Sequence, residues 1–86
     1  MRKLVKGVKE LTDGLEFELP ADSAAIRLAA EWVALERLCC PSLEIGLRIE
    51  RDCGGFWLVL TGGPGAKEFI RAEFAVWLDD AGQSVE

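Results

Sequence analysis

The residues with the most chemistry form one short run, Glu36-Arg37-Leu38-Cys39-Cys40-Pro41. Thiols and carboxylates both ligate metals, and the two cysteines follow Glu36 by three and four residues. In a helix, that spacing places all three side chains on one flank of a single turn. Adjacent helical residues point about 100° apart, so both sulfurs reach one ion only if the helix ends between them, as Pro41 favours. The run predicts a soft-metal or metalloid site made of Cys39, Cys40 and Glu36.

Two other interpretations fit the same residues. In the first, Cys39 is a small core residue, Cys40 is half-exposed and Glu36 forms a salt bridge at the rim of the helix. In the second, the thiols do redox chemistry, although a helix C-terminus and a nearby carboxylate raise a thiol pKa and reactive cysteines need a low one. A bound cation removes that objection, because a metal deprotonates its own thiol ligands.

Other residues are candidates for supporting roles around these thiols. Arg37 or Arg48 would have to lie against a sulfur for redox chemistry, and Glu73, which interrupts the apolar arc of a later helix, is expected to pair with one of these arginines. Cys53 would add a third sulfur only if the fold brought it near. No cofactor is expected to be required for folding.

Several kinds of active site are excluded or disfavoured by composition. The chain has no histidine, so Ser-His and Cys-His arrangements are impossible, and the paired C-x-x-C spacing of closed zinc sites is missing. The glycine-rich segment 61–67 lacks the Gly-Lys-Ser/Thr ending of a phosphate loop, and Pro64 removes a backbone donor, so we interpret it as a plain turn. The sequence identifies no catalytic residue and no small-molecule ligand, and it indicates a binding or interaction domain rather than an enzyme.

Length and composition predict one small globular domain. The chain has 86 residues, half of them apolar and 29% charged. No apolar stretch approaches the roughly 20 residues that span a membrane, and no signal-peptide core follows the basic N-terminus. Three cysteines are an odd number, which favours reduced thiols over a disulfide framework. We therefore expect a cytoplasmic protein without membrane association.

Charge argues against nucleic-acid binding. The net charge is −5, and four of the ten basic residues, Arg2, Lys3, Lys6 and Lys9, precede the first acidic one. The acidic remainder would repel a phosphate backbone, because nucleic-acid affinity requires clustered cations. The basic start of the chain fits an edge strand protected against aggregation.

The hydrophobic pattern predicts an α+β fold of the type ββαββα, with a four-stranded antiparallel sheet and two helices packed on one face. Alternation indicates strands, turn signals at Asp13-Gly14 and 52–55 indicate hairpins, and helices follow both hairpins. The expected strands cover 4–11, 15–19, 43–50 and 56–60, and the expected helices run from 24 to 39 or 40 and from 64 to 78. Residues 1–86 form a single domain, with an ordered core over 4–78 and a frayed tail over 79–86. The halves align as a weak ββα duplication, and the strand order stays open.

The same pattern predicts the core and a contact surface. Trp57 and Val59 alternate with core positions and project from the sheet face opposite the helices, beside Gly46. Apolar side chains on an uncovered face favour a partner, so a homodimer is expected, and a structural or interaction module without chemistry is the alternative function. The predicted core consists of Leu15, Phe17, Leu19, Leu28, Trp32, Leu35, Ile45, Leu47, Leu58, Phe69, Ile70 and Phe74.

The chain also resembles a family. Glu36-Arg37-x-Cys39-Cys40-Pro41, a hydrophobic strand after it, and Leu60-Thr61-Gly-(Gly)-Pro-Gly-x-Lys67-x-Phe69 are similar to a group of small, uncharacterised bacterial proteins. The similarity covers most of residues 8–75. The resemblance implies that the Cys-Cys-Pro element is a signature of the group, and it brings no activity, cofactor or substrate with it.

Overall fold

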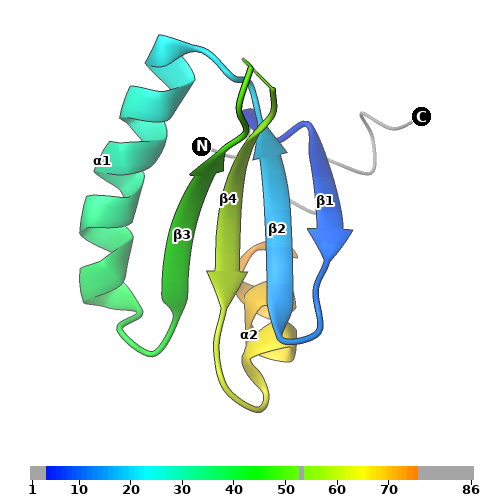
Figure 1. Cartoon of the computed structure of the whole chain (residues 1–86). Coiled ribbons are helices and arrows are strands. Elements are labelled where there is room, and N and C mark those ends of the chain that lie inside the picture. Colours follow the sequence, from blue (N-terminus) through cyan, green and yellow to red (C-terminus); the bar gives the residue numbers. More distant parts are fainter. Residues whose placement is uncertain (1–3, 53, 76–86) are drawn as a thin grey trace.

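The structure, a computed structural model, describes residues 4–52 and 54–75 (Figure 1). Four strands and two helices follow one another in the predicted order ββαββα. The strands are β1 (Gly7–Glu10), β2 (Gly14–Leu19), β3 (Glu44–Ile49) and β4 (Phe56–Thr61). The helices are α1 (Ser23–Cys39) and α2 (Ala66–Glu73). Helix α2 is shorter than the predicted 64–78, because it begins at Ala66 and ends at Glu73 with Phe74 as its C-cap. Residues 76–78 of the predicted helix, the tail 79–86 and Cys53 lie outside the described residues.

The strands form one antiparallel sheet in the order β1-β2-β4-β3. Both hairpins are present as predicted, and β2 additionally pairs with β4, with Phe17 opposite Leu58. Because β2 and β3 are both antiparallel to β4, they run parallel to each other on either side of it. Helix α1 therefore carries the chain from β2 past β4 to the far edge of the sheet, and Figure 1 shows it next to β3.

The two helices begin in different ways. The Asp22 side chain caps α1 by accepting a hydrogen bond from the Ala25 amide at 2.8 Å. Helix α2 follows Gly65, whose φ of 85° lies in the left-handed region that glycine tolerates best. No helix formed by the described residues has the length and apolar character needed to cross a membrane.

The core lies between the middle of the sheet and α2. Strands β2 and β4 contribute alternate residues that are almost completely buried, and the ring of Phe74 contacts the rings of Phe17 and Trp32 edge-on at 6.3 and 5.9 Å. These contacts from α1, α2 and β2 place both helices on one face of the sheet. The buried apolar residues are Val5, Leu15, Phe17, Leu19, Ala25, Ala29, Phe56, Leu58, Leu60, Ile70 and Phe74.

Part of the predicted core is wrong. Leu28, Leu35, Leu47 and Phe69 were expected inside, yet 44%, 72%, 38% and 41% of their surfaces are exposed. In α1 the cause is rotation of the helix about its axis: the buried positions are small alanines, so the leucines lie on a flank. Leu47 belongs to an edge strand, and Phe69 lies in the exposed part of α2. Trp32 and Ile45 are partly buried against the core.

Gly14 has a different role from the one its sequence context suggests. The first hairpin turns over Leu11–Gly14, where the Leu11 amide donates to the Gly14 carbonyl at 2.9 Å. Gly14 itself is the first residue of β2 and is buried. A Cβ at this position would lie 2.0 Å from the carbonyl oxygen of Leu60, so glycine is required because the backbones of β2 and β4 approach closely here.

Candidate metal centre

The two cysteines lie where α1 ends. Cys39 is the last helical residue, and Cys40 is the C-cap with φ −127° and ψ 70°. The Cys40 amide still donates to the Glu36 carbonyl at 2.8 Å, and the Leu43 amide donates to the Cys40 carbonyl at 3.2 Å across the turn that contains Pro41. The helix therefore ends between the two thiols, as Pro41 predicted, and Cys40 is released from helical geometry.

This ending brings three ligand atoms together. The two Sγ atoms and a carboxylate oxygen of Glu36 all lie within 4.8 Å of one another. With Zn–S bonds of about 2.3 Å, sulfurs around one tetrahedral ion would lie about 3.8 Å apart. The limit of 4.8 Å on the present spacing is about 1 Å greater than this separation. Both sulfurs can reach one ion only if the helix ends between Cys39 and Cys40, and the backbone meets this requirement.

Exposure of the three groups argues against a packing role for the first cysteine. Cys39 is exposed, whereas Cys40 and Glu36 are half-buried. An exposed thiol contributes little to a core, so the interpretation of Cys39 as a small core residue is wrong. The described residues give Glu36 no salt bridge within 4 Å, so the rim salt bridge expected in that interpretation is also missing.

The electrostatics of the cluster favour protonated sulfur when no cation is present. Burial raises the pKa of the Cys40 thiol to about 11, and hydrogen bonding with Cys39 and the negative charge of Glu36 act in the same direction. A thiol with this pKa is almost entirely protonated at neutral pH. It is a poor redox nucleophile, and it becomes a ligand only when an ion displaces its proton.

Among the described residues, no ion pair joins Arg37, Arg48 or Glu73, the residues expected to support the site, to Glu36. Arg48 forms its ion pair with Glu16, on the sheet face that the helices leave open. Arg37 and Glu73 are exposed, and within the described ranges neither has a salt bridge, so the expected pairing of Glu73 with an arginine is wrong. Cys53 falls outside the described residues, so the structure does not place a third sulfur.

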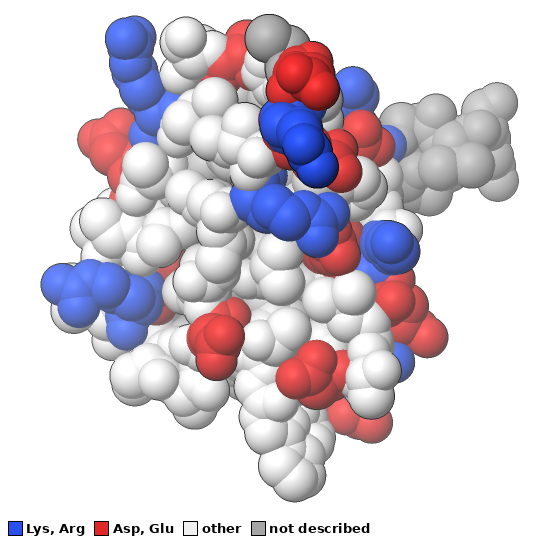
Figure 2. Space-filling model, viewed as in Figure 1, with Lys and Arg blue, Asp and Glu red and all other residues white. Residues whose placement is uncertain are grey.

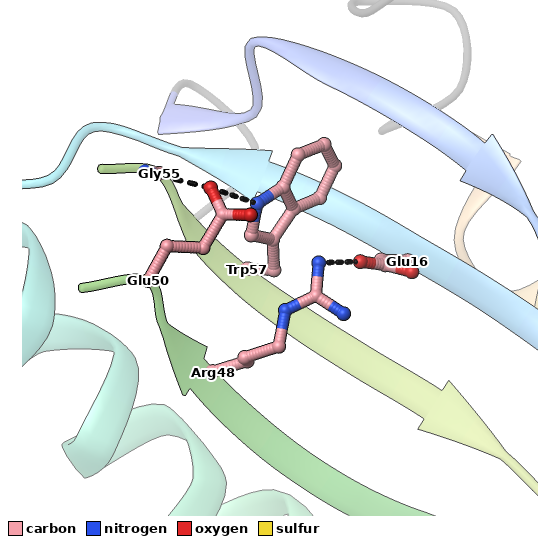
Figure 3. A network of polar contacts seen from close by, with 5 residues as sticks. All are labelled: Glu16, Arg48, Glu50, Gly55 and Trp57. Carbon is pink, nitrogen blue, oxygen red and sulfur yellow. Dashed lines mark hydrogen bonds and ion pairs between the residues drawn. The ribbon is translucent and has the colours of Figure 1, made fainter.

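The open face of the sheet carries a polar network that alternation alone did not indicate (Figure 3). Glu16, which alternates with the apolar core residues of β2, is only 3% exposed, and its carboxylate accepts a hydrogen bond from Arg48. The Arg48 guanidinium lies over the Trp57 ring at 5.5 Å from its centroid. Glu50 accepts hydrogen bonds from the Gly55 amide at 2.9 Å and from Trp57 Nε1 at 3.4 Å.

Trp57 and Val59 lie on this open face, as predicted. The neighbour of Gly46 in the register is Val59, whereas Trp57 lies opposite Arg48 and Glu18. Trp57 is therefore held by intramolecular polar and cation–π contacts. Its expected part in a contact with a second chain stays a prediction.

The glycine-rich segment forms a turn at the start of α2, as predicted. It borders an open hollow of about 450 Å³ together with Thr12 and Asp13. Lys67, a cation at this hollow, forms an ion pair with Glu10 at 3.4 Å. Nothing in this arrangement points to a phosphate.

Comparisons of the chain with protein-family models, with curated proteins and with solved structures found no match. The similarity to small bacterial proteins with a Cys-Cys-Pro signature therefore stays an expectation from the sequence. The candidate site rests on the geometry of its own residues.

Proposed function

We propose that the protein binds a thiophilic metal ion or metalloid through Cys39, Cys40 and Glu36. The observation that carries the proposal is the convergence of two thiols and a carboxylate within 4.8 Å at a helix end. The C-cap conformation of Cys40 supports it, since a continued helix would point the sulfurs apart. Exposure of Cys39 gives an ion access from solvent.

The donor set limits the ions that fit. Thiolates select soft or borderline ions such as Cu(I) and Zn(II), and a carboxylate is also an accepted zinc ligand. Three protein ligands leave one position of a tetrahedral zinc ion free for water or another ligand. Cu(I) and arsenite would use the two sulfurs and have little need of the carboxylate. Whether ion binding depends on the Glu36 carboxylate therefore distinguishes a zinc-like site from a purely thiolate site.

Binding must displace protons from the thiols, so affinity is expected to rise with pH. The Cys40 pKa of about 11 means that its proton is present at neutral pH and leaves when the ion binds. Reduced thiols are required, which fits the cytoplasmic location inferred from the cysteine number. Thiol redox chemistry is less well supported, because the same pKa leaves little thiolate to react.

Titration of the reduced protein with Zn(II), Cu(I), Hg(II) and arsenite tests the proposal. Wild type and Cys53→Ser should bind one equivalent, with thiolate charge-transfer absorbance where the ion gives one. Cys39→Ser/Cys40→Ser should lose this stoichiometric binding. Since any thiol protein takes up some mercury, the comparison between the variants is what decides. Equal binding by wild type and the double variant would overturn the proposal.

Glu36→Gln provides the finer test, because it keeps the shape of the side chain and removes the charge. We expect zinc affinity to fall by about 10–100-fold, the range typical when a group that holds or supports a metal ligand is removed. Arsenite affinity should change little. Glu31→Gln, which makes the same change at an exposed position of α1, is the control.

A further inference from the structure

The two edges of the sheet differ in how they are protected against pairing with another chain. The β1 edge is short, and its Glu10 forms ion pairs with Lys67 and Arg71 of α2. The β3 edge is formed by Glu44–Ile49. Its residue Arg48 pairs with Glu16 across the sheet face, and among the described residues no ion pair joins β3 to a helix. An unprotected edge strand is a template for pairing with a further strand.

The backbone groups that face outward at the β3 edge can be assigned. The Glu50 amide donates to the Gly55 carbonyl at 2.9 Å across the hairpin, so Glu50 faces β4. In an antiparallel ladder the direction alternates along the strand. Glu44, Gly46 and Arg48 therefore also direct their amide and carbonyl groups toward β4. The amide and carbonyl groups of the alternate residues, Ile45, Leu47 and Ile49, point away from the sheet.

Apolar side chains are exposed along the same edge. Leu47 and Ile49 pair with Leu58 and Phe56, which are fully buried, yet they themselves are 38% and 58% exposed. Helix α1, next to β3 in Figures 1 and 3, adds further exposed leucines. Figure 2 shows an uncharged area between the charged groups at the left margin and those in the middle of the view. The exposed leucines of α1 are Leu28, Leu35 and Leu38.

We propose that β3 pairs antiparallel with β3 of a second copy of this chain, around a two-fold axis that passes between the two Gly46 residues. The two sheets then become one continuous sheet of eight strands. The outward-facing amide and carbonyl of Ile45 in one protomer form hydrogen bonds with those of the partner's Leu47. By symmetry, Leu47 pairs in the same way with the partner's Ile45, and both are hydrogen-bonded pairs of an antiparallel ladder.

Charge complementarity selects this register. It places Glu44 of one protomer opposite the partner's Arg48, twice by symmetry, at non-hydrogen-bonded positions where side chains approach closely. A register centred on Leu47 would set Glu44 opposite the partner's Glu50. A register centred on Arg48 would place the two Arg48 side chains opposite each other. Arg48 remains 50% exposed after pairing with Glu16, so it is available to both carboxylates.

The open sheet face is a poorer surface for self-association. Its carboxylates, Glu16, Glu18 and Glu44, share the face with the cations Lys9 and Arg48, and Arg48 is already paired with Glu16 within the chain. Pairing at the β3 edge instead leaves the helices of both protomers on one side of the joined sheet. It also accounts for Leu28, Leu35 and Leu47, whose pattern predicts burial that the single chain does not provide.

Size measurement by analytical ultracentrifugation at micromolar concentration is the first test. Wild type should be dimeric, and Glu44→Arg should raise the dissociation constant by about tenfold or more, because two attractive pairs become repulsive. Glu73→Arg, the same charge change on the exposed surface of α2, should leave the dissociation constant unchanged. A monomeric wild type, or equal effects of both variants, would overturn the proposal.

Cross-linking tests the register itself. In a background with Cys39, Cys40 and Cys53 replaced by serine, Gly46→Cys should form an intermolecular disulfide under mild oxidation. Paired residues at such positions have Cα atoms about 4.5 Å apart, which is within disulfide range. A Cβ at Gly46 meets only Val59 at 3.9 Å, so the change is tolerated.

Gly63→Cys is the matched control, because its Cβ would enter open space in an exposed loop. Faster cross-linking of Gly46→Cys than of Gly63→Cys supports the register, and equal rates would overturn it. This background lacks the thiol ligands Cys39 and Cys40, so the cross-linking result is independent of the proposed metal binding.

Discussion

Two sides of this molecule are built differently. We use the name closed side for β2, β4 and α2, whose inward side chains, such as Phe17, Leu58 and Ile70, have no exposed surface. The name open side denotes α1 and β3, where large apolar residues and the exposed thiol of Cys39 remain accessible. The closed side supplies the stability that a small domain needs, and the open side is free to bind.

Replacing Leu58 or Leu47 by alanine is expected to show this difference most strongly. The two residues lie opposite each other in the β3–β4 register, so they differ mainly in burial. Leu58→Ala should cost about 2–5 kcal/mol in the free energy of unfolding, the usual range for a buried leucine. Leu47→Ala should cost less than about 2 kcal/mol, because 38% of its surface is already exposed.

Urea titrations in the Glu44→Arg background would make the comparison on the monomer. In the wild-type background at high concentration, Leu47→Ala should cost more if Leu47 is buried by a second chain. Equal costs for the two leucines in the monomer would contradict the division into two sides.

The second comparison concerns the close approach of β2 to β4. Gly14→Ala should destabilise the domain by about 1–3 kcal/mol or more, because its Cβ has no space beside the Leu60 carbonyl. Gly63→Ala, in the exposed loop, should change the stability by less than about 0.5 kcal/mol. Thermal unfolding followed by circular dichroism measures both. A tolerated Gly14→Ala would mean that the two strands are further apart than described.

The ion pair on the open face of the sheet is expected to have an intermediate effect. Arg48→Met would leave the buried Glu16 carboxylate without its partner, and we expect a loss of about 1–2 kcal/mol, since Arg48 itself is half-exposed. Adding Glu16→Gln should recover part of that loss. If the loss of stability in the double variant equals or exceeds the sum of the two single losses, the two residues are not a pair.

The sequence predicted the parts of this structure that depend on local pattern. Alternation located β2, β3 and β4, and Pro41 favoured the helix end that the structure places between the two thiols. The pairing of β2 with β4 could not be predicted, because both hairpins fit several strand orders. The rotation of α1 onto its alanines and the burial of Glu16 depend on contacts between distant segments, which no local pattern contains.

The pH dependence of Cys40 gives a smaller effect. Its pKa is raised from 9.0 to about 11 in the folded chain, so the folded state favours the protonated thiol. The associated stability is present below pH 9 and is lost as the pH rises from 9 toward 11. Reduced wild type should therefore lose stability relative to Cys40→Ser across this window in urea titrations. A constant difference between the two proteins would contradict the raised pKa.

X-ray absorption at the zinc edge tests the proposed metal centre most directly, with one equivalent of zinc bound to reduced Cys53→Ser protein. Two sulfur neighbours at about 2.3 Å and oxygen neighbours at about 2.0–2.2 Å are predicted. Glu36→Gln should leave the sulfur number at two. A first shell with one sulfur or none, or with four sulfurs drawn from two chains, would contradict a site formed by Glu36, Cys39 and Cys40 of one chain.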